Sequence, residues 1–343
     1  MMKFGNKKTK EEKVGLDIGS YSVKVVSADT GPGENTLTAY NIKNIPVGEK
    51  KIKVGDLVRE ALDEIDIHPK EVNLSISGPD VIVRFIDLPK MSKDQLKSAL
   101  SFEAEKYIPF NISEVVLDFL ILGDAPEEGQ MRVLLAAVKR EAVSGMVEMI
   151  ESLGMTINLI DTDPFAIFNA FSGTNPELGD QKKGIAFLDL GHSKTNILIS
   201  IGNVPCFMRQ IQIGGRDIDE AIAKNMSIPV EKAMELRLGG AKEKDSEAVK
   251  NTMMLILDEL VKEMHLSYGY FENRYNAKVE DVYCSGGMAY QEGVLDYLSE
   301  KLGLSAMKWN PVDSINLSEN ISKEDIDSVA LQLAVSIGLV LRN

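Results

Sequence analysis

Two stretches far apart in the chain share one pattern, and this repeat limits the possible folds more than any other feature. LDIGSYSVKVV at 16–26 and LDLGHSKTNIL at 188–198 each place an aspartate between two apolar residues, followed by glycine, a polar turn and an apolar strand. Asp17 corresponds to Asp189, and Gly19 to Gly191. Each stretch opens a strand-rich block, so the repeat predicts two related lobes that face each other. The alternative is two ordinary hairpins with similar turn residues.

The aspartates in these turns need a chemical reason, because a carboxylate in an apolar strand is costly to bury unless it is paired or binds a metal. Glycine turns present successive backbone N–H groups to an anion and let phosphate approach the backbone closely. Two carboxylates beside a phosphate suit Mg²⁺. The sequence has no G-x-x-x-x-G-K-[ST] motif, which excludes a P-loop. The repeat therefore predicts a metal–phosphate site between the lobes, with Asp17 and Asp189 as its carboxylates.

Composition excludes several other classes of protein. A formal charge of −14 over 343 residues argues against nucleic acid as a partner. Cys206, Cys284 and the three histidines have no metal-ligand spacing, and both cysteines lie in apolar runs that predict core positions. There is no apolar run of transmembrane length and no signal-peptide pattern, so we expect a cytoplasmic protein. The lysines within residues 3–13 are expected to form a solvated arm, with contact to anionic lipid as the alternative.

Hydrophobic periodicity divides the chain into four parts. A helix at 92–108, in which Ser92 and Gln95 have capping-box spacing, is followed by strands at 114–123 and 131–140 and a helix at 141–153. This order predicts a small inserted subdomain. Helices are also expected at 53–65 and 216–276, and one continuous apolar helix at 322–343. The predicted division is 13–88 with 155–180 and 322–343 for the first-lobe core, 89–154 for the inserted subdomain, 181–215 with 278–321 for the second-lobe core, and 216–277 for its helical subdomain.

Five motifs resemble, in order, those of the actin and heat-shock-chaperone ATPase superfamily. LDIGSYSVK and FLDLGHSKTNI resemble the two phosphate motifs, DTDPFAIFNAF the first connecting helix, IGGRDIDEAIA the Gly-Gly turn, and VYCSGGMA the adenosine motif. The resemblance implies an α/β fold: a two-lobed actin-like (ribonuclease H-like) ATPase fold with a small α+β subdomain inserted in the first lobe. Within the superfamily, FEAEKYIPFNISEVVLDF at 102–119 resembles the inserted subdomain of the PilM family of type IV pilus assembly. The resemblance extends over residues 12–342.

The resemblance implies a site for ATP and Mg²⁺. Asp17 and Asp189 would hold Mg²⁺ through water, and Asp163 would orient the attacking water. The residues expected to contact the nucleotide are Gly19, Ser20, Tyr21, Ser22, Lys24, Gly191, His192, Ser193, Gly214, Gly215, Arg237, Gly286, Gly287 and Met288. The alternatives are that Lys24 is a surface lysine on a strand and that Asp163 is the N-cap of a helix with Pro164 at N1.

Three departures from the superfamily pattern bear on nucleotide affinity, base preference and the rate of hydrolysis. Relatives tend to carry Ala-Glu-x-x-Lys in the helix that holds ribose and adenine, whereas this chain has Met234 at the Glu position and Arg237 at the Lys position. His192 is bulkier than the small residue usual after Asp-x-Gly. Asp163 is shorter than the chaperones' glutamate and must still come within hydrogen-bonding reach of a water. We therefore expect slow ATP turnover or none.

The resemblance also implies partners. It indicates an ATP-binding adaptor that binds the N-terminal cytoplasmic peptide of PilN in a groove between the first lobe and the inserted subdomain, near Tyr107, Ile108 and Phe110, which could equally be core residues. It implies contact with pilus assembly motor or platform proteins, possible self-association, and a membrane location only through partners. The alternative function is an FtsA-like polymerising protein of cell division, but the chain ends at Asn343 and its last helix is apolar enough to be buried. A small-molecule kinase is a third class, for which no substrate-binding set is recognisable.

Overall fold

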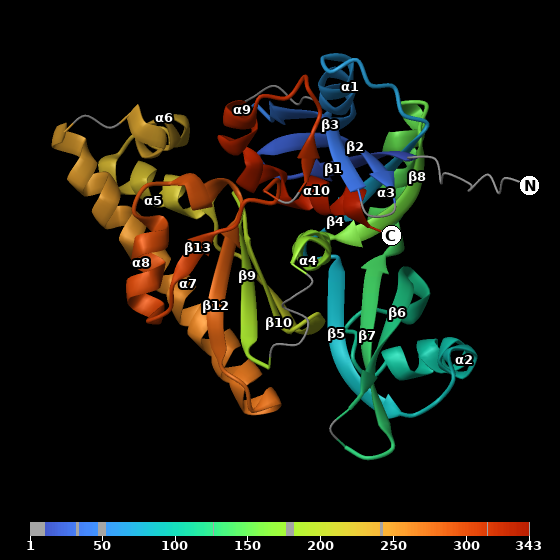
Figure 1. Ribbon diagram of the computed structural model, residues 1–343. Coiled ribbons are helices and arrows are strands. Elements are labelled where there is room, and N and C mark those ends of the chain that lie inside the picture. Colours follow the sequence, from blue (N-terminus) through green and yellow to red (C-terminus); the bar gives the residue numbers. More distant parts are fainter. Residues whose placement is uncertain are drawn as a thin grey trace, which may run out of the picture.

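The computed structural model describes residues 11–31, 34–46, 53–125, 127–175, 182–240, 243–313 and 315–342. The predicted N-terminal arm up to Lys10 lies outside these ranges. Two large sheets and one small sheet organise the described chain (Figure 1). The first large sheet has the order β14-β3-β2-β1-β4-β8 and the second the order β11-β10-β9-β12-β13.

The two large sheets repeat one topology, which is the structural counterpart of the sequence repeat. In the first, β1 pairs antiparallel with β2 and parallel with β4; in the second, β9 pairs antiparallel with β10 and parallel with β12. The strands of the first sheet are β1 Glu11–Ile18, β2 Ser22–Gly31, β3 Glu34–Asn44, β4 Glu71–Ile76, β8 Thr156–Thr162 and β14 Asn316–Leu317. Those of the second are β9 Gly184–Leu190, β10 Thr195–Ile201, β11 Val204–Ile211, β12 Val279–Ser285 and β13 Ala306–Lys308. The prediction of two related lobes is confirmed.

Helices α4 (Asp163–Thr174) and α10 (Ala334–Leu341) lie between the two sheets (Figure 1). One buried cluster contains Phe168 of α4, Phe187 of β9 and Ile337 of α10, so a single apolar core joins the lobes. The two helices approach closely at Gly338, where an added Cβ would lie only 1.9 Å from the carbonyl oxygen of Ala166. Glycine is required there because no side chain fits between the helices.

The outer faces of the lobes are covered by other helices. On the first lobe, α1 (Val54–Asp63) and α3 (Arg140–Ser152) pack on β1, β2 and β4 through a second apolar cluster. The second lobe carries α5 (Gly215–Met226), α6 (Val230–Glu235), the 33-residue α7 (Glu243–Tyr275) and α8 (Val294–Leu302). Cys206 and Cys284 are buried, as predicted, and neither is in a disulfide. In the described part of the chain, no helix combines the length and apolar character needed to span a bilayer.

The inserted subdomain is a three-stranded sheet, order β5-β7-β6, covered by α2 (Figure 1). Its elements are β5 Val81–Pro89, α2 Lys93–Ala104, β6 Val115–Asp124 and β7 Gln130–Lys139. The capping box of Ser92 and Gln95 forms as predicted. Three elements belong to other parts of the structure than the predicted domain boundaries gave them. β5 pairs with β7 and so belongs to the inserted subdomain. α3 buries Ile150 in the first-lobe core, and β14 pairs with β3 of the first lobe.

The predicted continuous helix at 322–343 is wrong, because the chain breaks it into three pieces. Helix α9 (Lys323–Asp327) begins after the capping side chain of Ser322, a 3-10 turn spans Ala330–Leu333, and α10 follows. At the break, the Leu331 carbonyl accepts a hydrogen bond from the N–H of Gly286, and the Leu331 N–H donates to the Tyr290 hydroxyl. These bonds to the second lobe hold the chain in place before it enters α10. Helix α10 itself is buried, as its all-round apolar sequence predicts.

Candidate functional site

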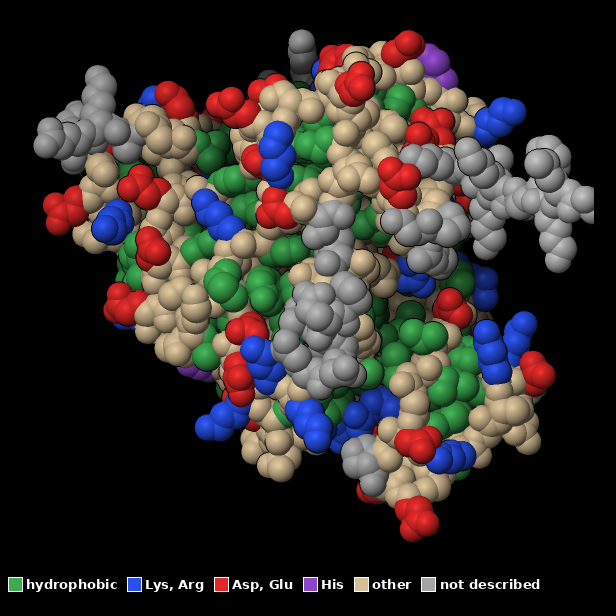
Figure 2. Space-filling model, viewed as in Figure 1, with side chains coloured by type: hydrophobic (Ala, Val, Ile, Leu, Met, Phe, Trp, Pro, Cys, Tyr) green, Lys and Arg blue, Asp and Glu red, His purple; other side chains and the backbone are tan. Residues whose placement is uncertain are grey.

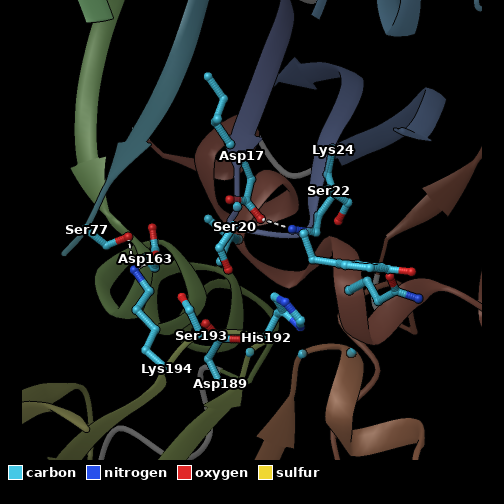
Figure 3. A pocket seen from close by; sticks show the side chains of 18 of the residues that line it. Asp17, Ser20, Ser22, Lys24, Ser77, Asp163, Asp189, His192, Ser193 and Lys194 are labelled. Atoms are coloured by element: carbon cyan, nitrogen blue, oxygen red, sulfur yellow. Dashed lines mark hydrogen bonds and ion pairs between the residues drawn. The ribbon is translucent and has the colours of Figure 1, made fainter. Parts of the chain in front are cut away.

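A cavity of about 380 Å³ lies where the two repeated turns meet (Figure 3). The first lobe contributes residues 17–22, Lys24, the loop 77–79 and Asp163. The second lobe contributes Asp189, residues 191–194 and the turn at 286–287, and residues 331, 332, 334 and 335 complete the wall. The structure thus brings both predicted phosphate turns and all three predicted carboxylates to one cavity between the lobes.

The two hairpins place equivalent pairs of polar side chains across their strands. Asp17 lies opposite Lys24 in the β1–β2 pairing, and Asp189 lies opposite Asn196 in the β9–β10 pairing. The Lys24 Nζ is 2.9 Å from the Asp17 Oδ2, and the Asn196 Nδ2 donates to the Asp189 Oδ2 over 3.0 Å. Lys24 lines the cavity, so the alternative that it is a surface lysine is wrong. Asn196 was not predicted, although aligning the two motifs places it at the position of Lys24.

This exchange of lysine for asparagine gives the two aspartates different hydrogen-bond partners, although the pKa of both is raised. Burial, the neighbouring Asp163 charge and Asp17 raise the pKa of Asp189 to about 6, against the opposing hydrogen bond from Asn196. Burial also raises the pKa of Asp17, although its Lys24 partner opposes the increase. Asp189 receives a neutral amide where Asp17 receives an ammonium group. A cation entering the cavity would therefore relieve the unfavourable charge on Asp189.

Asp163 is the first residue of α4, with Thr162 at the N-cap, so the alternative of Asp163 as the capping residue is wrong. Its Oδ2 lies 3.2 Å from the Nζ of Lys194. Burial alone would raise the pKa of this carboxyl, but the Lys194 charge and hydrogen bonds from Ser77 and Ser75 lower it below its ordinary value. The sequence interpretation missed Lys194 and Ser77. Lys194 was inside the second motif and could have been noticed, whereas Ser77 comes from a distant loop with no motif.

The turns themselves have matching backbone geometry. The Gly19 N–H donates to the Ser22 carbonyl and the Gly191 N–H donates to the Lys194 carbonyl, each over 3.0 Å. Gly286 has φ +88°, and a Cβ there would lie 2.5 Å from the Leu190 carbonyl oxygen. Glycine is therefore required where the third turn meets the end of β9.

A second hollow of about 380 Å³ adjoins the first and shares Tyr21 and His192 with it. The rings of these two residues, one from each lobe, have centroids 5.1 Å apart. Burial lowers the pKa of His192. Four residues predicted to contact the nucleotide line this hollow, namely Gly215, Arg237, Gly287 and Met288, whereas Gly286 lines the first cavity instead. Gly214 lies behind them, where an added Cβ would lie 2.5 Å from the His192 carbonyl.

Arg237 lines the second hollow, but its pairing with a buried carboxylate was not predicted from the sequence. Its Nε and Nη2 donate to Oδ1 and Oδ2 of Asp219 over 2.6 and 3.0 Å, and both side chains are buried. The guanidinium is thus held by the protein, and its charge is already balanced before any ligand is considered. Met234 is not among the residues that line the hollow.

The residues fit Mg²⁺ bound mainly through water and phosphate. Within the described ranges, no three His, Cys, Asp or Glu side chains cluster tightly enough to form a metal site by themselves. Mg²⁺ commonly keeps several waters and uses one or two carboxylates with substrate phosphates. Asp17 and Asp189, which line a cavity with two glycine turns, supply such a donor set.

The three residues predicted near the partner groove have different environments. Ile108 is buried with Leu96 and Leu100 in the core of the inserted subdomain, so it is not available to a partner. Phe110 packs on the same core, and the ammonium of Lys139 lies 4.9 Å from its ring centroid. Tyr107 is exposed.

Comparison with known proteins identifies the family of this chain. Residues 15–343 match the sequence family described as type IV pilus assembly protein PilM. The chain belongs to the PilM family. A chain of the PilM-PilN type IV pilus biogenesis complex superposes with a TM-score of 0.86 at 27% identity, covering 97% of this chain and 98% of that one.

More distant structures share the fold alone. The ethanolamine utilization protein EutJ from Carboxydothermus hydrogenoformans has a TM-score of 0.57 at 13% identity and covers 98% of this chain and 92% of its own. MreB5 of Spiroplasma citri, bound to ADP, has a TM-score of 0.52 at 12% identity and covers 96% of this chain and 94% of its own. The predicted two-lobed actin-like ATPase fold is confirmed. Membership of the PilM family favours the pilus assembly interpretation over the FtsA-like one.

Proposed function

We propose that the protein is an ATP-binding adaptor of type IV pilus assembly, which binds Mg²⁺–ATP between its lobes and presents the resulting lobe arrangement to protein partners. The observation that carries the proposal is the meeting at one cavity of two equivalent glycine turns with the buried carboxylates of Asp17 and Asp163 and the partly buried carboxylate of Asp189. Family membership supports the pilus role.

Different residues would bind the phosphates, the metal and the nucleoside. Backbone N–H groups of the two turns and the Lys24 ammonium would hold phosphates, while Asp17 and Asp189 would hold Mg²⁺ through water. The hollow beyond Tyr21 and His192 would take the nucleoside. Bound Mg²⁺ supplies charge neutralisation for the phosphates. Asp163 could not orient water for as long as Lys194 and Ser77 engage it, so hydrolysis would be slow.

Thermal unfolding with and without Mg²⁺–ATP tests this proposal. At a ligand concentration a hundredfold above Kd, binding is expected to stabilise the wild type by roughly 2.7 kcal/mol. Asp189→Ala is expected to remove that gain. Asp296→Ala, at an exposed position in α8 of the same lobe, is the control and should keep it. A wild type that Mg²⁺–ATP does not stabilise would contradict the proposal.

For the protein partner we propose the N-terminal cytoplasmic peptide of PilN, docked along β6. This strand lies at the edge of the small sheet in the described structure. Its side chains alternate: Leu117 and Phe119 pack toward the core with α2, whereas Val116 and Leu120 are 40% and 56% exposed. In Figure 2 apolar side chains gather on the inserted subdomain below the first lobe. An extended peptide can add to a free sheet edge while apolar side chains fix its position. A related chain occurs in a PilM-PilN complex, which supports the choice.

Titration of a labelled PilN peptide by fluorescence anisotropy tests the docking surface. Leu120→Asp places a charge on the proposed contact and is expected to weaken binding at least about tenfold, which corresponds to about 1.4 kcal/mol. Phe102→Ser is the control, because Phe102 is 68% exposed on α2, which covers the other face of the sheet. Loss of binding with Phe102→Ser and not with Leu120→Asp would move the groove to α2.

A further inference from the structure

Lys194 is the residue of the cavity whose side chain links the two lobes through charge. It belongs to the turn between β9 and β10, and its carbonyl accepts the hydrogen bond from Gly191 that closes this turn. Its ammonium group donates to the Ser77 hydroxyl and lies 3.2 Å from the Asp163 Oδ2 (Figure 3). Both partners belong to the first lobe, because Ser77 follows β4 and Asp163 begins α4. The Lys194 side chain is 19% exposed and that of Asp163 is 9% exposed.

These contacts make Lys194 different from Lys24, the other lysine of the cavity. Lys24 pairs with Asp17 in its own hairpin, so its position does not depend on the second lobe. Lys194 reaches its carboxylate only while the lobes keep their present spacing. An ammonium group is a compact charge on a flexible stem with three donors, so it can be redirected to another anion in the same cavity.

We propose that Lys194 senses the terminal phosphate of a nucleoside triphosphate, exchanging Asp163 and Ser77 for that group. A diphosphate lacks this third phosphate, so Lys194 keeps Asp163. When Lys194 leaves, the Asp163 carboxylate loses its ammonium partner and becomes able to accept a hydrogen bond from water. One side chain thereby couples recognition of the triphosphate to release of the candidate water-orienting group. This inference rests on the proposed nucleotide binding.

Calorimetric titration of AMPPNP and ADP, each with Mg²⁺, tests the inference without relying on turnover. Lys194→Met is expected to weaken AMPPNP binding about tenfold or more, the effect of losing one charge-assisted hydrogen bond, and to leave ADP binding within about twofold. Ser77→Ala removes one of the two competing partners and is expected to increase the preference for AMPPNP over ADP. Lys250→Met, at an exposed position on α7, controls for the loss of one positive charge and should change neither value.

The outcomes separate this inference from the function on which it rests. Equal loss of AMPPNP and ADP binding in Lys194→Met, or no change in either, would overturn the sensing role while leaving nucleotide binding intact. A wild type that binds neither nucleotide would overturn both. Retained ADP binding shows that the Lys194 variant is folded. If that variant fails to fold, Ser77→Ala decides, and an unchanged AMPPNP-to-ADP ratio overturns the inference.

Discussion

Replacing Asp189 by asparagine should make the protein more stable at neutral pH, although it removes a residue of the proposed site. The fold raises the pKa of Asp189 from an ordinary value of 3.8 to about 6. A raised carboxyl pKa means that the folded state favours the protonated form. The contribution of this group to stability is therefore complete below about pH 4 and is lost as the pH rises through 6.

The size of the effect follows from the same two values. The difference between 3.8 and about 6 corresponds to about 3 kcal/mol. Asparagine keeps one side-chain oxygen to accept the hydrogen bond from Asn196 and carries no charge. We therefore expect Asp189→Asn to match the wild type at pH 4 and to exceed its free energy of unfolding by up to about 3 kcal/mol at pH 7.

Urea unfolding of wild type and variant between pH 4 and pH 7, without nucleotide or Mg²⁺, measures this difference. Changes at carboxyls outside the cavity cancel between the two proteins. Glu292→Gln, at an exposed position of the second lobe, is the control and should show no such pH-dependent gain. A difference between Asp189→Asn and wild type that stays flat across this pH range would refute the reasoning, because Asp189 would then not titrate near pH 6.

Two further substitutions test the packing around the site. Arg237→Met leaves the buried Asp219 carboxylate without its guanidinium partner and should cost about 3–5 kcal/mol in urea unfolding, much of which Asp219→Asn in the same chain should restore. An undiminished loss in the double variant would contradict this account. Gly338→Ala should cost at least about 1–3 kcal/mol, because its Cβ would meet the Ala166 backbone at 1.9 Å. Gly269→Ala in α7 is the matched control, where a Cβ meets no described atom within 4 Å and alanine should stabilise the helix by about 0.5–1 kcal/mol. Equal effects of the two alanines would refute the close contact of α4 and α10.

The sequence predicted the parts of the site that are local in the chain. Asp17 and Asp189 could be assigned because each lies in a turn whose pattern is complete within about ten residues. The contacts of Lys194 with Ser77 and Asp163 could not be predicted, because they depend on how far the lobes stand apart. The same limit applies to Arg237, whose partner Asp219 lies on another helix.

Hydrophobic periodicity likewise predicted the interior of each helix better than the points where one element ends and the next begins. The capping box at Ser92 formed because its hydrogen bonds involve only residues three apart. The break before α10 was missed, because it depends on the hydrogen bond that the Leu331 carbonyl accepts from Gly286 and the one that the Leu331 N–H donates to Tyr290. The assignment of β5 to the first lobe failed for a related reason, since strand pairing with β7 is set by residues more than forty positions later.

The inserted subdomain is anchored at two places, and this limits how it can move. It is joined to the first lobe by its covalent connections, while Asp87 of β5 accepts hydrogen bonds from Arg132 of β7 at 2.9 Å and from Arg274 of α7 in the second lobe at 2.7 Å. The Arg132 guanidinium also lies over the ring of Tyr275, 4.7 Å from its centroid. The inserted subdomain is therefore connected to both lobes, covalently to the first and through Asp87 to the second. A rotation that opens the cleft must strain or break the Asp87 contacts. Binding in the cleft and binding at the subdomain are therefore coupled, and each changes the free energy of the other by the same amount.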